Sequence, residues 1–318
     1  MELASLPSLK NKTRHYLNAH ISKRTAKNYR KKHAHYKKFC TQLNIYKYSE
    51  KSLSLYASHL AEFQSYNYIL QCLTAIKHYR KRFKKPRKLI YLKQVLSGIK
   101  RTITTKSATP PRLPITPKKL RTIKRFIETT IPSKENRNMV WCAMLFGFYG
   151  FLRISEYTNP NKWKYSDKTR TLTSEDIDYH DDYISINLKK SKTDQGQQGT
   201  TITLARNDTG LCPIKAYQKY IKSRSFQEGP FFVFKDSSFL TPQTFNQIIK
   251  SALPPTQQGV YSSHSLRSGA ASTAAAKGYP TYIIQSLGRW SSEAYRTYIQ
   301  INNDFCSKIS SDLASCEK

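Results

Sequence analysis

The sequence predicts a mainly α-helical protein with one small antiparallel β-sheet (an α+β fold), divided into two domains. Apolar residues recur at three- and four-residue steps along most of the chain, which is typical of amphipathic helices. Residues 175–204 instead alternate or are rich in Ile and Thr, which favours strands. Four prolines lie in residues 102–117, between a strongly basic first part and the rest. We therefore expect a helical domain at 1–101, an extended linker at 102–116 and a second domain at 117–318.

Four apolar stripes predict a small bundle of four helices in the first hundred residues. The first helix starts near Ser22, and Ser49 is suited to cap the second. The stripes consist of Ala26, Tyr29, Tyr36, Phe39 and Cys40; of Leu53, Tyr56, Leu60 and Phe63; of Ile69, Leu73, Ile76 and Tyr79; and of Leu89, Leu92, Leu96 and Ile99.

In the second domain, Thr116 and Pro117 are a cap residue and a first-turn proline that open a helix. The apolar run from Met139 to Leu152 follows and indicates a buried helix around 137–149. Strands are expected at 176–179, 183–188 and 200–204, with the turn at 194–199 joining the last two as a hairpin. The remaining expected helices are 213–223, 241–251, 264–277, 281–287 and 293–299.

The charge of the chain indicates a polyanionic partner. It holds 54 Lys plus Arg against 20 Asp plus Glu, a net charge of +34, and residues 1–101 alone carry 24 basic and 3 acidic residues. The positive charges repel one another and destabilise the fold. Binding to nucleic acid or to an anionic membrane surface relieves this repulsion. The longest apolar run has only 14 residues and contains two glycines, too short to span a bilayer. No secretory signal is evident at the N-terminus, so we expect double-stranded DNA as partner and no membrane.

The cysteines do not indicate a metal site. All six are scattered, with no CxxC pair, which is typical of reduced thiols in an intracellular protein. We therefore expect neither a metal nor another cofactor.

One pair of residues in the second domain has the spacing of an anion site. His264 and Arg267 lie three residues apart on an expected helix, so they share a face. Ser262 or Ser263 is placed to cap this helix, whose N-terminal amides would then face the anion.

Other polar residues of this domain have ordinary structural explanations when each is taken alone. Arg153 could end the buried helix and pair with Glu156, and Lys192 lies in a lysine run that water would normally surround. Trp290 would ordinarily pack in a core, and Tyr298 is one of 22 tyrosines.

The order of these residues changes that interpretation. The blocks FYGFLRISE, SKTD, HSLRSGA, LGRW and AYRTYI place Arg153, Lys192, His264, Arg267, Trp290 and Tyr298 at successive separations of 39, 72, 3, 23 and 8 residues. In this order and spacing, residues 117–300 resemble the tyrosine recombinase (phage integrase) family. The Gly-Arg-Trp and Ala-Tyr-x-x-Tyr-Ile blocks look most like recombinases of eukaryotic mobile elements such as Crypton-type transposons. The resemblance implies a tyrosine-recombinase catalytic domain. The first domain has no matching motif, and we assign it to the family's core-binding DNA clamp by its position and helical content alone.

These residue types suit the cutting and rejoining of DNA without metal or ATP. Two guanidiniums, Arg153 and Arg267, can hold the charge that develops on a phosphoryl group. By the resemblance, Tyr298 attacks the phosphate, His264 accepts its proton and Lys192 protonates the departing 5′ oxygen. Trp290 would buttress the site. The covalent 3′-phosphotyrosine conserves the bond energy for rejoining. The resemblance also implies a homotetramer on DNA, acting as a site-specific recombinase or transposon integrase.

Two assignments have nearby competitors. Tyr295 and Tyr298 share a face of the last expected helix, so spacing alone does not choose the nucleophile. Tyr298 precedes Ile299, as the family's nucleophile in such elements commonly does, whereas Tyr295 resembles a packing aromatic. Lys190 and Lys192 share one face of the hairpin strand, and the Ser-Lys-Thr context favours Lys192.

Two basic runs of the first domain are the expected DNA contacts. One interleaves cations with aromatic residues on a helix, and the other is a loop broken by Pro86 that also suits a nuclear import signal. We expect a nuclear protein in a eukaryotic host and a cytoplasmic one otherwise. The expected contacts are Arg30, Lys31, Lys32, Lys37 and Lys38 in the first run and Arg80, Lys81, Arg82, Lys84, Lys85, Arg87 and Lys88 in the second.

Two other functions fit the same residues. A DNA-binding protein descended from a recombinase would have lost cleavage, although all six catalytic-type residues are present here. A type IB topoisomerase shares the tyrosine chemistry, although the separate basic domain and the Gly-Arg-Trp block favour a recombinase.

Overall fold

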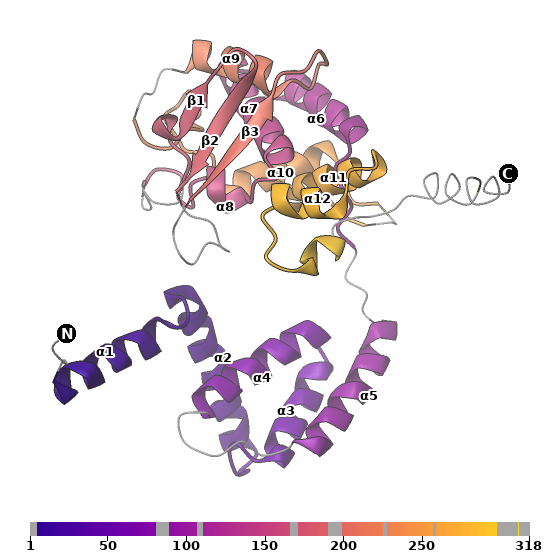
Figure 1. The fold of residues 1–318 in the computed structure, drawn as a ribbon. Coiled ribbons are helices and arrows are strands. Elements are labelled where there is room, and N and C mark those ends of the chain that lie inside the picture. The colour runs from indigo at the N-terminus through magenta and orange to yellow at the C-terminus, as the bar shows by residue number, and fades with distance from the viewer. Residues whose placement is uncertain are drawn as a thin grey trace, which may run out of the picture. The chain divides into compact units, whose positions relative to one another are not determined.

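The computed structural model describes residues 5–80, 89–106, 111–165, 171–189, 199–224, 228–256, 259–297 and 311. The chain divides into two compact units, Met1–Thr109 and Pro110–Lys318 (Figure 1). No described helix is long and apolar enough to cross a membrane.

The first unit is helical, as expected. Helix α2 packs against α4, and α3 packs against α5, around a core that includes Tyr36, Tyr56 and Ile76. Ser22 and Ser49 cap α2 and α3, since their hydroxyls accept hydrogen bonds from the backbone N–H of Thr25 and Ser52. The helices are α1 (Leu6–Ala19), α2 (Lys23–Gln42), α3 (Glu50–Ala61), α4 (Tyr66–Arg80) and α5 (Ile90–Lys106).

Helix α1 was not predicted from the sequence. It has no buried residue, and its larger apolar side chains, among them Leu6 and Tyr16, are exposed. The helix therefore lacks the buried stripe by which the other four were recognised.

The expected linker is wrong at both ends. Helix α5 continues to Lys106, five residues past the expected end of the first domain. Beyond the gap, Leu113 N–H donates to the carbonyl of Val260, and Val260 N–H donates to that of Pro111, each at 2.9 Å. Ile115 N–H also donates to the carbonyl of Ser265, at 2.8 Å. Residues 111–115 are therefore an ordered strand-like part of the second unit.

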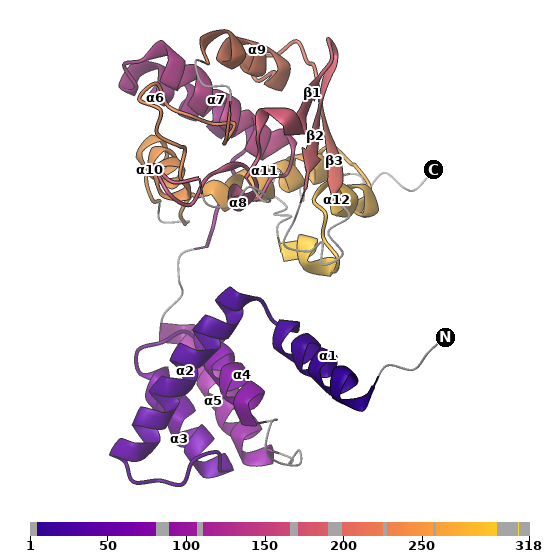
Figure 2. The ribbon, with the colours of Figure 1, turned by 90° about the vertical axis from the view of Figure 1, so that its left-hand side faces the viewer.

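The second unit surrounds the buried helix α7 (Lys134–Tyr149), in which every residue from Met139 to Phe148 is buried. Figure 2 shows the sheet on one side of α7, with α6 and α10 on the other. The other helices are α6 (Pro117–Thr130), α8 (Ile154–Tyr157), α9 (Pro213–Ser223), α10 (Pro242–Ala252), α11 (Ser263–Ala276) and α12 (Thr281–Leu287), with 3₁₀ turns at Ser174–Asp176 and Glu293–Thr297.

The sheet is the predicted small antiparallel one. Its strands are β1 (Ile177–Tyr179), β2 (Tyr183–Leu188) and β3 (Thr200–Ala205), in that order. Ile184 and Ile186 of β2 are buried, because alternate residues of the strand face the helices. The expected final helix is a 3₁₀ turn as far as Thr297, and residues 298–300 lie outside the described part of the chain.

Candidate active site

The first part of the site is the sharp turn that follows α7. Phe151 adopts a left-handed backbone (φ 48°), and two residues later Arg153 occupies the N-cap position of the short helix α8. Arg153 Nη1 lies 3.0 Å from Glu156 Oε1, and its backbone N–H donates to Oε2 at 2.8 Å. The ion pair expected from the sequence therefore exists. The Glu156 side chain is 4% exposed and that of Arg153 18%, so the arginine is the partner that reaches toward solvent.

The second part is the first turn of α11, which carries His264 and Arg267. Arg267 is buried and donates through its two terminal nitrogens to the carbonyls of Phe151 and Gly288. Its guanidinium carbon lies 4.4 Å from the centre of the Trp290 ring. These contacts fix a buried cation between α7, α11 and the loop that precedes Trp290.

Ser262 occupies the N-cap position of α11, but its hydroxyl does not cap the helix as expected. Ser262 N–H instead donates to Ser265 Oγ at 3.0 Å, and Asn246 Oδ1 accepts from Ser263 N–H at 2.7 Å. The helix start is thus held by neighbouring side chains.

Trp290 and Tyr295 form the wall beside Arg267. Trp290 meets Phe151 edge-on with ring centres 6.2 Å apart, and Tyr295 packs at 6.4 Å from Trp290. Tyr295 is 5% exposed. This burial agrees with the packing role expected for Tyr295.

Burial and nearby positive charges keep the His264 imidazole neutral near pH 7. Burial is the main cause that lowers the pKa of His264 to about 4, because it penalises the charged imidazolium. The positive charges of Arg112, Arg267 and Arg153 act in the same direction. A neutral imidazole near pH 7 can accept a proton, as the expected role requires.

Sequence reasoning missed Arg289. Its guanidinium donates to Glu156 Oε2 at 2.9 Å and to the carbonyls of Gly150 and Phe151 at 3.1 and 3.2 Å. Arg289 lies in the Gly-Arg-Trp block, in which the sequence led us to assign a role in the site to Trp290 alone.

The structure brings Arg153, His264, Arg267 and Trp290 into one site, whereas Lys190, Lys192 and Tyr298 lie outside the described residues. Lys189 Nζ lies 2.8 Å from the buried carboxylate of Asp176, so this lysine is held at the end of β2.

The expected DNA contacts on α2 differ in exposure. Arg30, Lys31, Lys37 and Lys38 are exposed. Lys32 is half-buried: its Nζ lies 3.6 Å from the centre of the Tyr68 ring and 3.4 Å from Gln71 Oε1. Lys32 is therefore engaged within the unit. Of the second run, Arg80 ends α4, its side chain is not described, and residues 81–88 lie outside the described part.

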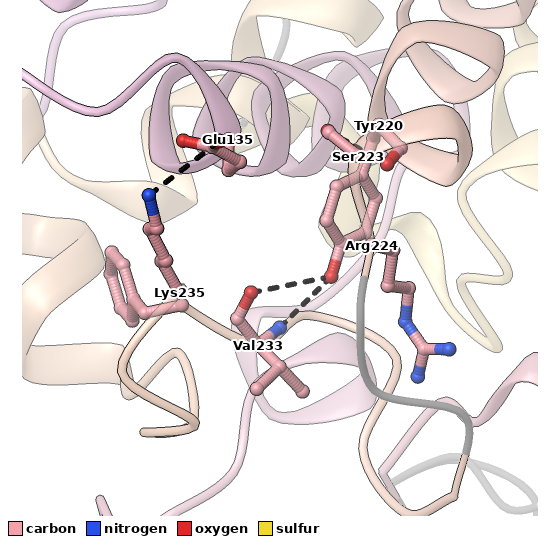
Figure 3. A pocket seen from close by; sticks show the side chains of 7 residues that line it. Glu135, Tyr220, Ser223, Arg224, Val233 and Lys235 are labelled. Carbon is pink, nitrogen blue, oxygen red and sulfur yellow. Dashed lines mark hydrogen bonds and ion pairs between the residues drawn. The ribbon is translucent and has the colours of Figure 1, made fainter.

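A pocket near the start of α7 is separate from this site (Figure 3). It lies at the opposite end of α7 from Arg153, and the 16 residues of this helix span about 24 Å. Its polar groups are paired: Lys235 Nζ lies 3.8 Å from Glu135 Oε1, and Tyr220 bonds to the backbone of Val233. Within the described residues, no group of His, Cys, Asp and Glu side chains is arranged to hold a metal ion.

Comparison with known proteins decides the family. Residues 114–304 match the family model described as the phage integrase family. The chain belongs to the phage integrase family. This confirms the resemblance of the motif blocks to tyrosine recombinases. A comparison with curated protein sequences gave no match.

Solved structures of tyrosine recombinases share the fold. XerH site-specific recombinase bound to difH substrate has a TM-score of 0.59 at 16% identity, over 85% of this chain and 72% of that one. The Tn1549 transposon integrase with circular intermediate DNA has a TM-score of 0.53 at 16% identity, over 83% and 85%. A lambda integrase dimer on a core site has a TM-score of 0.55 at 15% identity, over 94% and 97%.

Proposed function

We propose that this chain is a site-specific DNA recombinase or transposon integrase that cuts and rejoins double-stranded DNA through a 3′-phosphotyrosine intermediate. The observation that carries the proposal is the cluster of Arg153, Arg267 and neutral His264 beside Trp290, in a chain of the phage integrase family. The solved relatives include recombinases bound to DNA, which supports DNA as the substrate.

The arginines prepare the scissile phosphate. The two guanidiniums bind the non-bridging oxygens of the phosphate. They stabilise the negative charge that increases on these oxygens as the tyrosine oxygen attacks and the phosphorus becomes five-coordinate. Arg267 is rigid because two carbonyls and the Trp290 ring hold it. It therefore needs little reorganisation at the moment of reaction.

Proton transfers complete the step. Tyr298 attacks the phosphorus through its hydroxyl oxygen, and His264 accepts the hydroxyl proton. The bond to the 5′ oxygen breaks, and Lys192 gives that oxygen a proton. Rejoining runs the same steps backwards with another 5′ hydroxyl, so the energy of the broken bond is retained.

The first unit supplies binding energy through the exposed cations of α2, namely Arg30, Lys31, Lys37 and Lys38. In the proposed reaction four protomers pair two DNA sites and exchange strands one pair at a time. The Gly-Arg-Trp block supports a mobile-element enzyme within the family.

The test is covalent trapping on a nicked suicide substrate of cognate DNA, from which the cleaved end diffuses away. We expect wild-type protein and Tyr295→Phe to become attached to DNA, and Tyr298→Phe to bind DNA without attachment. The Tyr295 hydroxyl contributes only about 1 kcal/mol as a hydrogen-bonding group, so its loss leaves the fold intact.

Other results would replace the proposal. A Tyr298→Phe protein that still becomes trapped would move the nucleophile. DNA binding without any trapping by the wild type would indicate an inactive descendant, and supercoil relaxation without recombination would indicate a topoisomerase.

A further inference from the structure

Arg289 occupies an unusual place in the loop before Trp290. It lies between Gly288 and Trp290, whose carbonyl and ring respectively contact Arg267. Its own backbone is left-handed (φ 52°), a conformation that glycine adopts more readily. The side chain is 9% exposed, so this arginine stands in a backbone conformation and an environment that both disfavour it.

The side chain of Arg289 connects two elements far apart in the sequence. Its Nη1 donates to the Gly150 carbonyl and its Nη2 to the Phe151 carbonyl, both in the turn that leads to Arg153. Nη2 also lies 2.9 Å from Glu156 Oε2. A planar guanidinium can make these bonds together, whereas a lysine ammonium offers no such fork.

Glu156 is thereby shared between two arginines. Its Oε1 faces Arg153 Nη1 at 3.0 Å, and its Oε2 faces Arg289 Nη2. Within the described part of the chain, Nη1 is the one guanidinium nitrogen of Arg153 that is bonded to a protein group. The side chain is 18% exposed, so its remaining nitrogens can donate to the oxygens of a ligand.

The net charge around Glu156 depends on Arg289. One buried carboxylate beside two guanidiniums leaves a net positive charge. If Arg289 were uncharged, Glu156 would neutralise Arg153 alone. Its Oε2 would keep the bond from the Arg153 backbone N–H but lose its charged partner, which would favour a closer, bidentate pair with the Arg153 guanidinium. That pair would occupy the donors that a phosphate needs.

We propose that Arg289 is a positioning residue for strand cleavage, which binds Glu156 and thereby keeps the charge and the donors of Arg153 available to the scissile phosphate. The inference rests on the proposed function.

The test compares two substrates that differ at the scissile position. One carries the natural phosphodiester and the other an uncharged methylphosphonate, which has less need of cationic stabilisation. Single-turnover cleavage is measured for the wild type, Arg289→Gln, Arg289→Lys and Arg137→Gln. Arg137 is the matched control, because it donates at 2.8 Å to the carbonyls of Ile131 and Pro132 at the opposite end of α7.

Arg289→Gln should slow cleavage of the phosphodiester on the order of 10- to 100-fold, as a misplaced catalytic group does. Its cleavage of the methylphosphonate should fall much less. Arg289→Lys retains the charge that balances Glu156, so its ratio of rates on the two substrates should stay close to that of the wild type even where both rates fall. Arg137→Gln should match the wild type on both. Equal slowing of Arg289→Gln on the two substrates would overturn the proposal, since a purely structural defect does not distinguish them.

A binding measurement separates this proposal from the proposed function. In the Tyr298→Phe background, the affinity for the phosphodiester over the methylphosphonate site reports how strongly the site holds the phosphate charge. Arg289→Gln should reduce that preference and Arg289→Lys should keep most of it, whether or not the wild type cleaves DNA. An unchanged preference in Arg289→Gln would refute the role of Arg289 while leaving the cleavage proposal intact.

Discussion

Replacing His264 with glutamine is expected to change how the stability of the DNA-free protein depends on pH. The folded protein holds the pKa of His264 at about 4, whereas a histidine in the unfolded chain titrates near 6.5. Between these values the unfolded state binds more protons than the folded state. The wild type should therefore lose stability as the pH falls from about 6.5 toward 4, and glutamine removes this dependence.

The structure sets the size of the effect. The two pKa values differ by about 2.5 units, and each unit corresponds to about 1.4 kcal/mol, so the full loss is about 3 kcal/mol, on the order of a third of the stability of a typical domain. Roughly three fifths of it should be lost by pH 5. Bound DNA brings a phosphate to the site and would raise the pKa of His264, so the prediction concerns the protein alone.

The assay is urea unfolding between pH 7 and pH 4.5, followed by tryptophan fluorescence. All three tryptophans, Trp141, Trp163 and Trp290, lie in the second unit, so the signal reports on the unit that contains His264. His180→Gln, which removes an exposed histidine of the same unit, is the control. If the wild type and His264→Gln lost equal stability over this range, the account of a desolvated imidazole among arginines would be refuted.

Three further predictions concern the reaction with DNA. Cleavage should be unaffected by EDTA, because protein cations supply the positive charge at the phosphate; loss of cleavage restored by magnesium would contradict this. Replacing Lys31, Lys37 and Lys38 with alanine should weaken the salt dependence of DNA binding, by about 0.9 in log–log slope for each phosphate that is no longer neutralised. Lys32→Ala should change this slope little, because Lys32 is engaged within the unit. An unchanged slope in the triple variant would mean that these lysines do not contact DNA. Cleavage by Lys192→Ala should be restored on a 5′-phosphorothiolate substrate, whose leaving group needs no proton. If cleavage by Lys190→Ala were restored instead, Lys190 would be the proton donor.

Periodicity predicted the elements that bury a stripe of apolar residues. Helices α2 to α5, the apolar α7 and the three strands were all recognised because burial repeats at the period of each structure. Helix α1 buries no residue, so it leaves no such pattern. Prolines in residues 102–117 suggested a free linker, but long-range backbone bonds to Val260 and Ser265 order its second half, and no local rule anticipates them.

Site residues that belong to a family motif could be predicted from the sequence. Residues that reach the site only through the folding of distant segments could not. Arg153, His264, Arg267 and Trp290 were found by their order along the chain. The contacts of Arg289 join positions 133 to 139 residues apart and depend on left-handed turns at Phe151 and Arg289. Neither residue is a glycine, so the sequence does not mark either turn.

The extended segment at residues 111–115 determines where a catalytic fragment of this chain can begin. A catalytic fragment that began at Pro117 would discard the chain that bonds Val260 and covers Gly269, where even a methyl group would collide with the Ile115 carbonyl. A fragment intended to fold alone must therefore start before Pro111. The same segment also joins the chain ahead of Pro111 to the site, because Ile115 N–H donates to the carbonyl of Ser265, the residue beside His264.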